Sequence, residues 1–272
     1  METKLTSQRQ TSQRSRVLNL RTWKTGEGPR VTLGYTYFQD RVHLERQLQL
    51  WKDYPSYVDI FLVDDGSEDE EALEVIKESG WDLPEYGPTF QLWKCTRNLG
   101  FNSHGCRNLI ARYALSDYIA FFDIDMQIST ETVGRLITRK YSERNFYQHD
   151  LWVKHEQRGV PYPGHMNSFL IHKDLYWEAG GYDESFTGHH WGDREFLERL
   201  FTCEHRKVNS SLCVTLDRKG RHGKIVDTVK KTEYEPNEDL SFLCPIDVDE
   251  IKELRGKVKT KLNFPFIKQK DL

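Results

Sequence analysis

The stretch Tyr118-Ile119-Ala120-Phe121-Phe122-Asp123-Ile124-Asp125-Met126 decides the fold. A continuous apolar run of this length, entered from Ser116 and Asp117, is typical of a strand buried on both faces of a mostly parallel sheet. The run ends in two carboxylates one residue apart. In open α/β sheets, ligands bind outside the carboxyl ends of the strands, so Asp123 and Asp125 are expected at the mouth of a binding crevice.

The two carboxylates allow two interpretations. Like charges this close repel unless something neutralises them, and hard oxygen ligands suit Mg2+ or Mn2+, which also bind substrate phosphates. Alternatively, the aspartates belong to an ordinary turn after a strand and hydrogen-bond their own backbone. The motif alone does not choose between a metal site and a turn.

Strands and helices alternate in the first half of the chain. Buried strands are predicted at 31–37, 58–63, 89–93 and 118–122. Leu44, Leu48 and Trp51 recur at helical spacing after the first strand, and a further helix is predicted over about 104–115. After the second strand, Gly66 permits a tight turn and Ser67 is expected to cap the next helix. This alternation indicates a parallel sheet with helices on both faces.

Four short motifs follow one another through this half: Val63-Asp64-Asp65-Gly66-Ser67, Arg97-Asn98-Leu99-Gly100, Cys106-Arg107-Asn108 and Phe122-Asp123-Ile124-Asp125. In order and spacing they resemble the nucleotide-binding half of A-type-fold glycosyltransferases, particularly glycosyltransferase family 2. The resemblance implies a GT-A (Rossmann-like) α/β fold. Such a fold has a mostly parallel central sheet, flanking helices and a small acceptor-side subsheet.

The second half carries further motifs: Asn167-Ser168-Phe169-Leu170-Ile171, Gly180-Gly181-Tyr182-Asp183-Glu184, Trp191-Gly192-Asp193-Arg194-Glu195-Phe196 and Arg221-His222-Gly223-Lys224. The first three are similar to the acceptor-site segment of the same enzymes and of the animal beta-galactosyltransferases. The last resembles the galactosyltransferase segment whose histidine completes the metal site. The resemblance covers about residues 30–237.

The resemblance implies a donor site formed by Thr36, Tyr37, Asp65, Asn98, Gly100, Arg107 and Asp123. In that site Asp65 reads the nucleobase, Thr36 and Tyr37 line the base pocket, and Arg107 lies toward the diphosphate or the base. Asn98 and Gly100 belong to a loop near the donor.

The resemblance also implies a metal site for Mn2+ or Mg2+. Asp125 is the expected direct ligand, Asp123 reaches the ribose or the metal shell, and His222 supplies a nitrogen ligand from a distant segment. A metal ion there acts as a Lewis acid that stabilises the departing diphosphate.

Asp193 matches the family's general base, which takes the proton of the acceptor hydroxyl. The family usually has a glutamate where this chain has Gly192, so Asp183 or Glu195 is expected to do part of the work of that carboxylate. The alternative role for Asp193 is that of an ordinary acidic residue at the N-terminal end of a helix.

His190 and Trp191 complete the predicted acceptor site. Aromatic rings stack on the apolar faces of sugars, so both residues are expected acceptor contacts. The alternative is that they are ordinary loop residues.

The flanks suggest three parts. Residues 1–28 are polar and basic and are predicted to form a disordered tail. Residues 29–237 form the catalytic domain, with a nucleotide-sugar-binding half at 29–126 and an acceptor-binding half at 127–237. Residues 238–272 are predicted to be a partly helical appendage packed on the domain.

Composition limits the remaining classes. The 272 residues carry a net charge of -3 and have a pI near 6.4, which argues against a general nucleic-acid binder but leaves a nucleic-acid acceptor open. No signal peptide or membrane-spanning apolar run is seen, so a soluble cytoplasmic protein is expected. The five cysteines are odd in number and form no close ligand pair, so neither a disulfide framework nor a zinc site is expected.

These observations predict a metal-dependent, inverting glycosyltransferase that moves a sugar from a UDP-sugar to a hydroxyl of a glycan or glycoconjugate. One aspartate does not decide between UDP and GDP. Gly192 keeps open a catalytically impaired nucleotide-sugar or glycan-binding protein. A nucleotidyltransferase is a weaker alternative, because residues 35–41 do not form the glycine-rich basic phosphate loop that such enzymes usually carry after the first strand.

Overall fold

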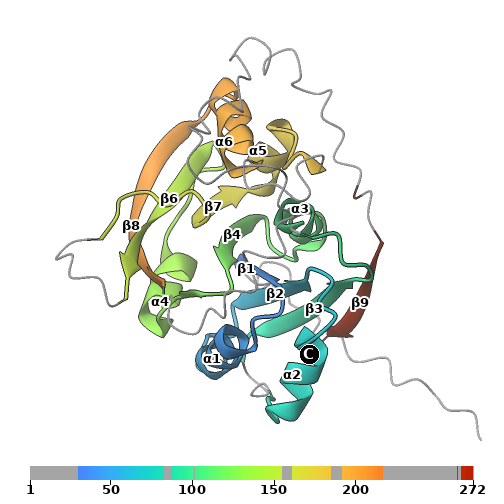
Figure 1. Cartoon of the computed structure of the whole chain (residues 1–272). Helices are drawn as coiled ribbons and strands as arrows, with labels where there is room; N and C mark the ends of the chain where they lie inside the picture. Colours follow the sequence, from blue (N-terminus) through green and yellow to red (C-terminus); the bar gives the residue numbers. More distant parts are fainter. Residues whose placement is uncertain are drawn as a thin grey trace, which may run out of the picture.

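The computed structural model describes residues 30–82, 87–100, 102–154, 161–184, 192–216, 262 and 265–271 (Figure 1). Its elements are β1 (Val31–Tyr37), α1 (Arg41–Trp51), β2 (Val58–Asp64), α2 (Ala72–Glu78), β3 (Thr89–Cys95), α3 (Ser103–Tyr113), β4 (Tyr118–Asp123), β5 (Met126–Gln127), α4 (Thr130–Thr138), β6 (Asn145–Val153), β7 (Phe169–His172), α5 (Lys173–Glu178), α6 (Gly192–Thr202), β8 (Arg206–Leu216) and β9 (Phe266–Asp271).

The strands form one sheet in the order β5-β8-β6-β7-β4-β1-β2-β3-β9. The four central strands, β4, β1, β2 and β3, are mutually parallel, as the sequence predicts. The β7 strand pairs antiparallel with β4, and β9 pairs antiparallel with β3, so the sheet as a whole is mixed. All four predicted strands are present, and three of them continue one or two residues past the predicted end.

Alternate residues of the central strands point to opposite faces of the sheet. One core cluster contains Leu33 and Tyr35 of β1 and packs against α1, α2 and α4. The other contains Phe61 of β2 and Phe121 of β4 and packs against α3, α5 and α6. Figure 1 shows α1 and α2 on one side of the sheet and α3 on the other. The side that a residue faces therefore decides which helices it meets.

The turn after β2 is built around Asp64 and Gly66. Asp64 accepts hydrogen bonds from the N–H groups of Ser67 (2.8 Å) and Ala72 (2.9 Å), so its side chain satisfies the first N–H of α2, whose N-cap residue is Glu71. The prediction that Ser67 caps this helix is wrong, because α2 begins five residues later and the Ser67 hydroxyl accepts from the Gln39 N–H instead. Gly66 has φ of +78°, a conformation that favours glycine.

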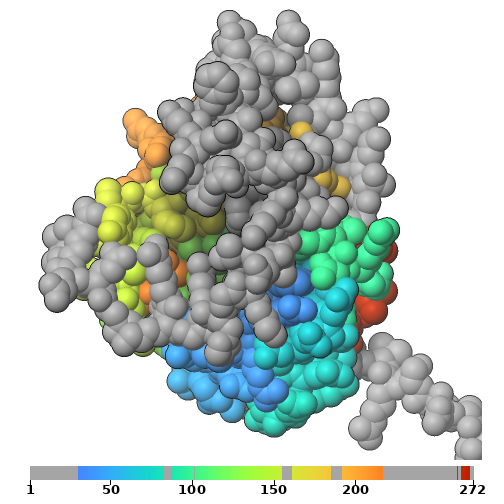
Figure 2. Space-filling model, viewed as in Figure 1, coloured from blue at the N-terminus to red at the C-terminus, as the bar shows by residue number. Residues whose placement is uncertain are grey.

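The C-terminal segment adds a strand. Residues 266–271 pair with β3, and the Thr96 N–H donates to the carbonyl oxygen of Pro265 (3.0 Å). The prediction of a partly helical appendage is therefore wrong for residues 266–271, which form a strand. The open edge of β3 offers backbone hydrogen bonds that a strand satisfies. In Figure 2, β9 (red) lies beside the green surface of α3 at the edge of the molecule.

Several predictions fall outside the described part. The tail at 1–28 and residues 238–261 lie outside it, and the division between 126 and 127 stays a prediction. Among the described helices, none is long and apolar enough to cross a membrane.

A glycine pair tests the turn after β2. An added Cβ at Gly66 would lie 2.6 Å from the Arg97 carbonyl oxygen, whereas at Gly80, with φ of +60°, nothing lies within 4 Å. Gly80→Ala is expected to cost about 1 kcal/mol for its positive φ, and Gly66→Ala about 1–3 kcal/mol more for the added clash. Urea unfolding measures both, and equal losses would contradict the close approach at Gly66.

His149 of β6 makes stability depend on pH. Its ring stacks on Phe122, its Nδ1 lies 2.7 Å from the Ser210 hydroxyl, and burial, helped by Arg139, lowers its pKa to about 3. Since the unfolded chain binds this proton below about pH 6.5, stability is expected to fall as pH drops from 6.5, by up to about 1.4 kcal/mol per unit.

His149→Gln keeps a hydrogen-bonding group for Ser210 and removes the titration. Its unfolding free energy, measured from pH 6.5 to 4.5, is expected to fall less steeply than that of the wild type. A comparison at pH 8, where the ring is neutral in both states, gives the packing cost alone. Equal slopes in the two proteins would refute the buried neutral histidine.

Candidate functional site

The period of two along the strands brings the candidate residues to one side of the sheet. Phe61 and Val63 of β2 and Phe121 of β4 point to the side of the sheet that packs against α3. By the same alternation, Asp65 and Asp123 point to that side. Thr36 lies beside both strands, since it pairs with Val63 of β2 and with Asp123 of β4. The carboxyl ends of these strands therefore meet the N-terminal half of α3.

Arg107 of α3 joins the two halves of the site. Its guanidinium donates to Asp123 Oδ1 (2.9 Å), to Asp193 Oδ1 and to the Tyr182 hydroxyl (3.2 Å), and only 1% of the residue is exposed. Burial alone disfavours the charge, but Asp193 and Asp123 outweigh it, and the pKa of Arg107 is raised well above its usual value. Arg107, predicted for the donor site, thus holds Asp123, which is also predicted for the donor site, and Asp193, the predicted base.

Asp193 lies in the first turn of α6 and is buried. Its Oδ1 also accepts from the Tyr182 hydroxyl (2.9 Å). Burial favours the neutral acid, but Arg107, with help from His104 and Tyr182, prevails and lowers the pKa of Asp193. Asp193 is therefore ionised at neutral pH, and its partners hold its basicity down.

Asn108 fixes the segment that carries Tyr182. Its Oδ1 accepts from the Tyr176 hydroxyl (2.6 Å) and the Tyr182 N–H (2.9 Å), and its Nδ2 donates to the Tyr182 carbonyl (2.8 Å) and to Glu184 (3.1 Å). The two residues before Tyr182, Gly180 and Gly181, have positive φ. Arg107 and Asn108 together bind the acceptor-side segment to α3.

Two of the three predicted metal ligands lie at the end of β4, in different settings. Asp123 accepts from Arg107 and, through Oδ2, from Asn167 Nδ2 (3.1 Å), and its side chain is 25% exposed. Asp125 is 1% exposed. A carboxylate has about four acceptor positions, so the two bonds to Asp123 leave room for a cation. The oxygen donors fit Mg2+ or Mn2+, with Asp123 and Asp125 as the residues to hold it.

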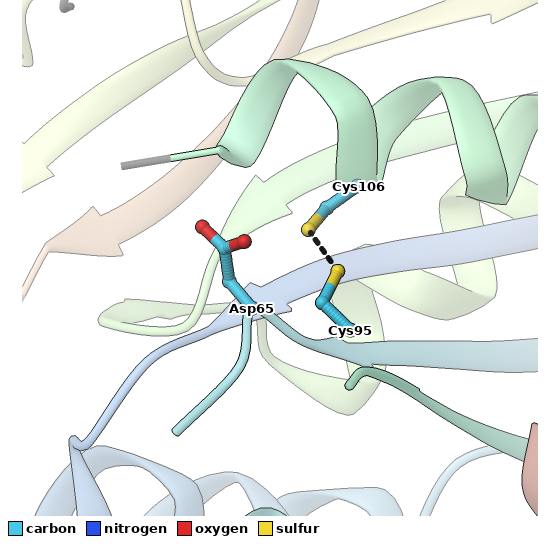
Figure 3. A group of neighbouring side chains, drawn as sticks. All are labelled: Asp65, Cys95 and Cys106. Carbon is cyan, nitrogen blue, oxygen red and sulfur yellow. Dashed lines mark hydrogen bonds between the residues drawn. The ribbon is translucent and has the colours of Figure 1, made fainter. Parts of the chain in front are cut away.

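Asp65 lies after β2, 4% exposed, with its Oδ2 accepting from the Asn102 N–H (2.8 Å). Its Oδ1 has no hydrogen-bonding nitrogen or oxygen among the described residues. Figure 3 shows the carboxylate beside the thiols of Cys95 and Cys106. Burial raises the pKa of Asp65 to about 7.

Two predicted site residues have other positions. Tyr37 belongs to the core cluster on the α1 and α2 side, and its hydroxyl donates to the Glu70 carbonyl, because adjacent strand residues point to opposite faces. It therefore does not share a pocket with Asp65. Glu195 is buried, with both oxygens bound by Arg199 of the same helix, so it does not replace the missing acceptor-site carboxylate.

Gly192 has a physical reason to lack a side chain. A Cβ at this position would lie 2.4 Å from the Cδ2 and Nε2 atoms of His104, whose ring is fully buried on α3. The glutamate that the resemblance expects cannot stand here while the His104 ring keeps its place.

The remaining predicted residues are placed as follows. Asn98 Oδ1 accepts from the Gly100 N–H (2.9 Å) in the turn after β3, and Gly100 has φ of +82°. Asp183 is half-buried, and its charge adds to the effect of burial, which raises the pKa of Glu195 against the lowering by Arg199. His190, Trp191 and His222 lie outside the described residues.

Sequence reasoning missed the parts played by His104, Asn108, Asn167 and Tyr182. The available signal for three of them was their place within the sequence motifs that resemble the family: Asn108, Asn167 and Tyr182. Their contacts are 60 or more positions apart along the chain in most cases, so spacing alone does not reveal them. His104 had no signal, because its partner Gly192 is 88 residues away (192 minus 104).

Comparison with known families and structures gives one family and several solved structures of similar fold. The family model described as "Glycosyl transferase family 2" matches residues 41–201. Residues 1–349 of S. aureus TarS match with a TM-score of 0.54 at 15% identity, over 69% of this chain and 60% of that one. The mannosyltransferase PcManGT from Pyrobaculum calidifontis, in complex with GDP-Man and Mn2+, matches with a TM-score of 0.54 at 14% identity, over 72% and 60%.

The same TarS fragment in complex with UDP gives a TM-score of 0.53 at 12% identity, over 74% of this chain and 64% of that one. At such identities the likeness shows the fold alone, and it confirms the predicted GT-A architecture. The chain spans less than two thirds of the length of each of these structures. No curated protein matches the sequence. The likeness to beta-galactosyltransferases stays a prediction.

A double-mutant cycle tests the Arg107–Asp193 pair. Arg107→Met leaves two carboxylates without their partner, one of them buried, and is expected to cost about 3–5 kcal/mol of unfolding free energy. In Asp193→Asn the Arg107→Met change is expected to cost about 1–3 kcal/mol less, because one of the stranded charges is gone. Additive losses in urea unfolding would show that the pair is not coupled.

Proposed function

Because this chain belongs to glycosyl transferase family 2, we propose that it transfers a sugar from a UDP-sugar to a hydroxyl group of a glycan or glycoconjugate, with inversion at the anomeric carbon and with Mn2+ or Mg2+ at the end of β4. The observation that carries the proposal is the chain of contacts from Asp123 through Arg107 to Asp193. It sets a phosphate-side carboxylate and a candidate base on the two sides of one buried cation.

Donor binding is assigned to the strand ends. In this proposal Asp65 Oδ1 accepts an N–H of the nucleobase, since the other carboxylate oxygen is held by Asn102. Uracil and guanine both present such an N–H, so UDP is preferred over GDP on the resemblance and not on this contact. A divalent cation bound by Asp123 and Asp125 would supply Lewis-acid stabilisation of the departing diphosphate. The Mn2+ in the PcManGT complex supports the use of a divalent cation in this fold.

The transfer step is assigned to Asp193. The acceptor hydroxyl attacks the anomeric carbon opposite the diphosphate, the bond to the phosphate oxygen breaks, and Asp193 takes the hydroxyl proton. The lowered pKa keeps Asp193 ionised and ready to accept that proton. Arg107 and the Tyr182 hydroxyl both donate to Asp193, so the acceptor hydroxyl competes with them for this carboxylate. Arg107 also holds the Asp193 carboxylate in a fixed orientation.

A second candidate is a nucleotide-sugar or glycan binder without turnover. The observations that favour it are the ion pair that weakens Asp193 as a base and the His104 ring that excludes a carboxylate from position 192. Under this hypothesis the donor binds and the sugar stays on it.

Binding and turnover of a panel of UDP- and GDP-sugars separate the two candidates. With Mn2+, the correct donor at 100 times its Kd is expected to stabilise the fold by about 2.7 kcal/mol, seen as a rise in Tm, and to release nucleotide when an acceptor is supplied. Asp125→Asn is expected to lose the metal-dependent rise. Asp193→Asn is expected to keep it while its rate falls about 100-fold or more.

Asp174→Asn, an exposed carboxylate of α5, is the matched control and should leave both readouts unchanged. Metal-dependent binding with no release of nucleotide would favour the binder. A product with retained anomeric configuration would exclude Asp193 as the base of an inverting reaction.

A further inference from the structure

Three metal-ligating side chains meet beside the proposed nucleobase position. Asp65, Cys95 and Cys106 place a carboxylate oxygen and two sulfur atoms within 4.8 Å of one another, and all three residues are buried. Asp65 follows β2, Cys95 ends β3 and Cys106 lies in the first half of α3. In Figure 3 one carboxylate oxygen of Asp65 points toward the Cys106 sulfur. The cysteines are 11 positions apart, which is why the sequence predicts no zinc site here.

The distance between the two sulfur atoms agrees with one ion held by both thiolates. The two sulfur atoms are 3.9 Å apart. In tetrahedral zinc sites the Zn–S bond is about 2.3 Å, which puts two thiolates about 3.8 Å from each other. The sulfurs therefore need almost no movement to share an ion, whereas a disulfide would require them to approach to about 2 Å.

We propose that Asp65, Cys95 and Cys106 bind one thiophilic divalent metal ion such as Zn2+, at a site separate from the carboxylates at the end of β4. Two thiolates select Zn2+ over Mg2+ and Mn2+, which prefer oxygen ligands. The three protein ligands leave a fourth tetrahedral position for water or another group.

The surroundings already orient two of the ligands. The Asn102 N–H holds Asp65 Oδ2, and Asn102 Nδ2 approaches the Cys95 sulfur at 4.0 Å, so one residue supports both an oxygen and a sulfur ligand. The Oδ1 atom of Asp65 is buried, and no described nitrogen or oxygen donates to it. An ion would satisfy this atom. Groups of this kind around the ligands tune metal affinity in known sites.

Binding at this site exchanges protons for the metal. Without an ion, burial raises the pKa of Asp65 to about 7 and that of the Cys106 thiol well above its usual value. The Asp65 acid and the Cys106 thiol would each release a proton as Zn2+ binds. Affinity is therefore expected to increase with pH.

One consequence rests on the proposed function. Asp65 would serve both the ion and the nucleobase, so a thiophilic metal and the nucleotide are expected to exclude each other. Zn2+ would then inhibit an enzyme that Mn2+ supports at its other site.

Cobalt titration of the reduced, metal-free full chain tests the site directly. Co2+ bound to thiolates has a sulfur-to-metal charge-transfer band, which a carboxylate site lacks. We expect this band to saturate at one Co2+ per chain and to disappear when Zn2+ is added. Cys95→Ala and Cys106→Ala should each halve the band and the double variant should abolish it, while Asp65→Asn should weaken affinity at least about tenfold.

Two controls keep the result specific. Cys203→Ser combined with Cys213→Ser removes the other described cysteines and should keep the band, and Asp125→Asn should keep it while removing the carboxylate site. Circular dichroism and thermal unfolding establish that each variant is folded. Absence of the band in the wild type, or its persistence in the folded double variant, would overturn the proposal. Neither result affects the donor-binding assay, so failure here and failure of the proposed function are distinct.

Discussion

A buried guanidinium needs anionic partners, and Arg107 obtains them from two distant parts of the chain. Asp123 belongs to the end of β4 and Asp193 to the start of α6, and both bind this one side chain. Because an unpaired charge in this position costs several kcal/mol, the three residues have to stay together. The separation between Asp123 and Asp193 is therefore set by the width of one arginine guanidinium.

The sheet decides which residues take part. Since side chains alternate along a strand, Asp65, Cys95 and Asp123 all face α3, while Tyr37 and Asp64 face α1 and α2. Asp64 accepts from the first N–H of α2, and the Tyr37 hydroxyl donates to the carbonyl of Glu70, two residues before that helix. Asp64 and Asp65 are adjacent and therefore point to opposite faces of the sheet. Asp64 supports α2, and Asp65 lies on the face of the candidate site.

The acceptor side shows how a missing carboxylate is accommodated. The His104 ring occupies the space next to Gly192, and it also contributes to the lowered pKa of Asp193. Glu195 is committed to Arg199, so it is not a substitute. The chain therefore has one ionised carboxylate, Asp193, where the resemblance expects two, and its environment is set by Arg107, Tyr182 and His104. Asp193 is therefore the one carboxylate of this pair of positions that is left to act as a base.

The sequence by itself determined the parallel core and the family, because buried strands, helical spacing and short motifs are local signals that read directly along the chain. It also predicted that Arg107, Asp123 and Asp193 belong to one site, and the structure brings these three side chains into contact. That Asp65 belongs to the same site stays a prediction. Only the tertiary structure decided that Arg107 bridges two carboxylates and that the His104 ring fills the space beside Gly192. It also decided that Tyr37 faces the other side of the sheet and that Glu195 binds Arg199. It alone brought Cys95 and Cys106 to Asp65. Those contacts depend on which face a strand residue takes and on how helices from distant segments pack, and neither is recorded in local spacing.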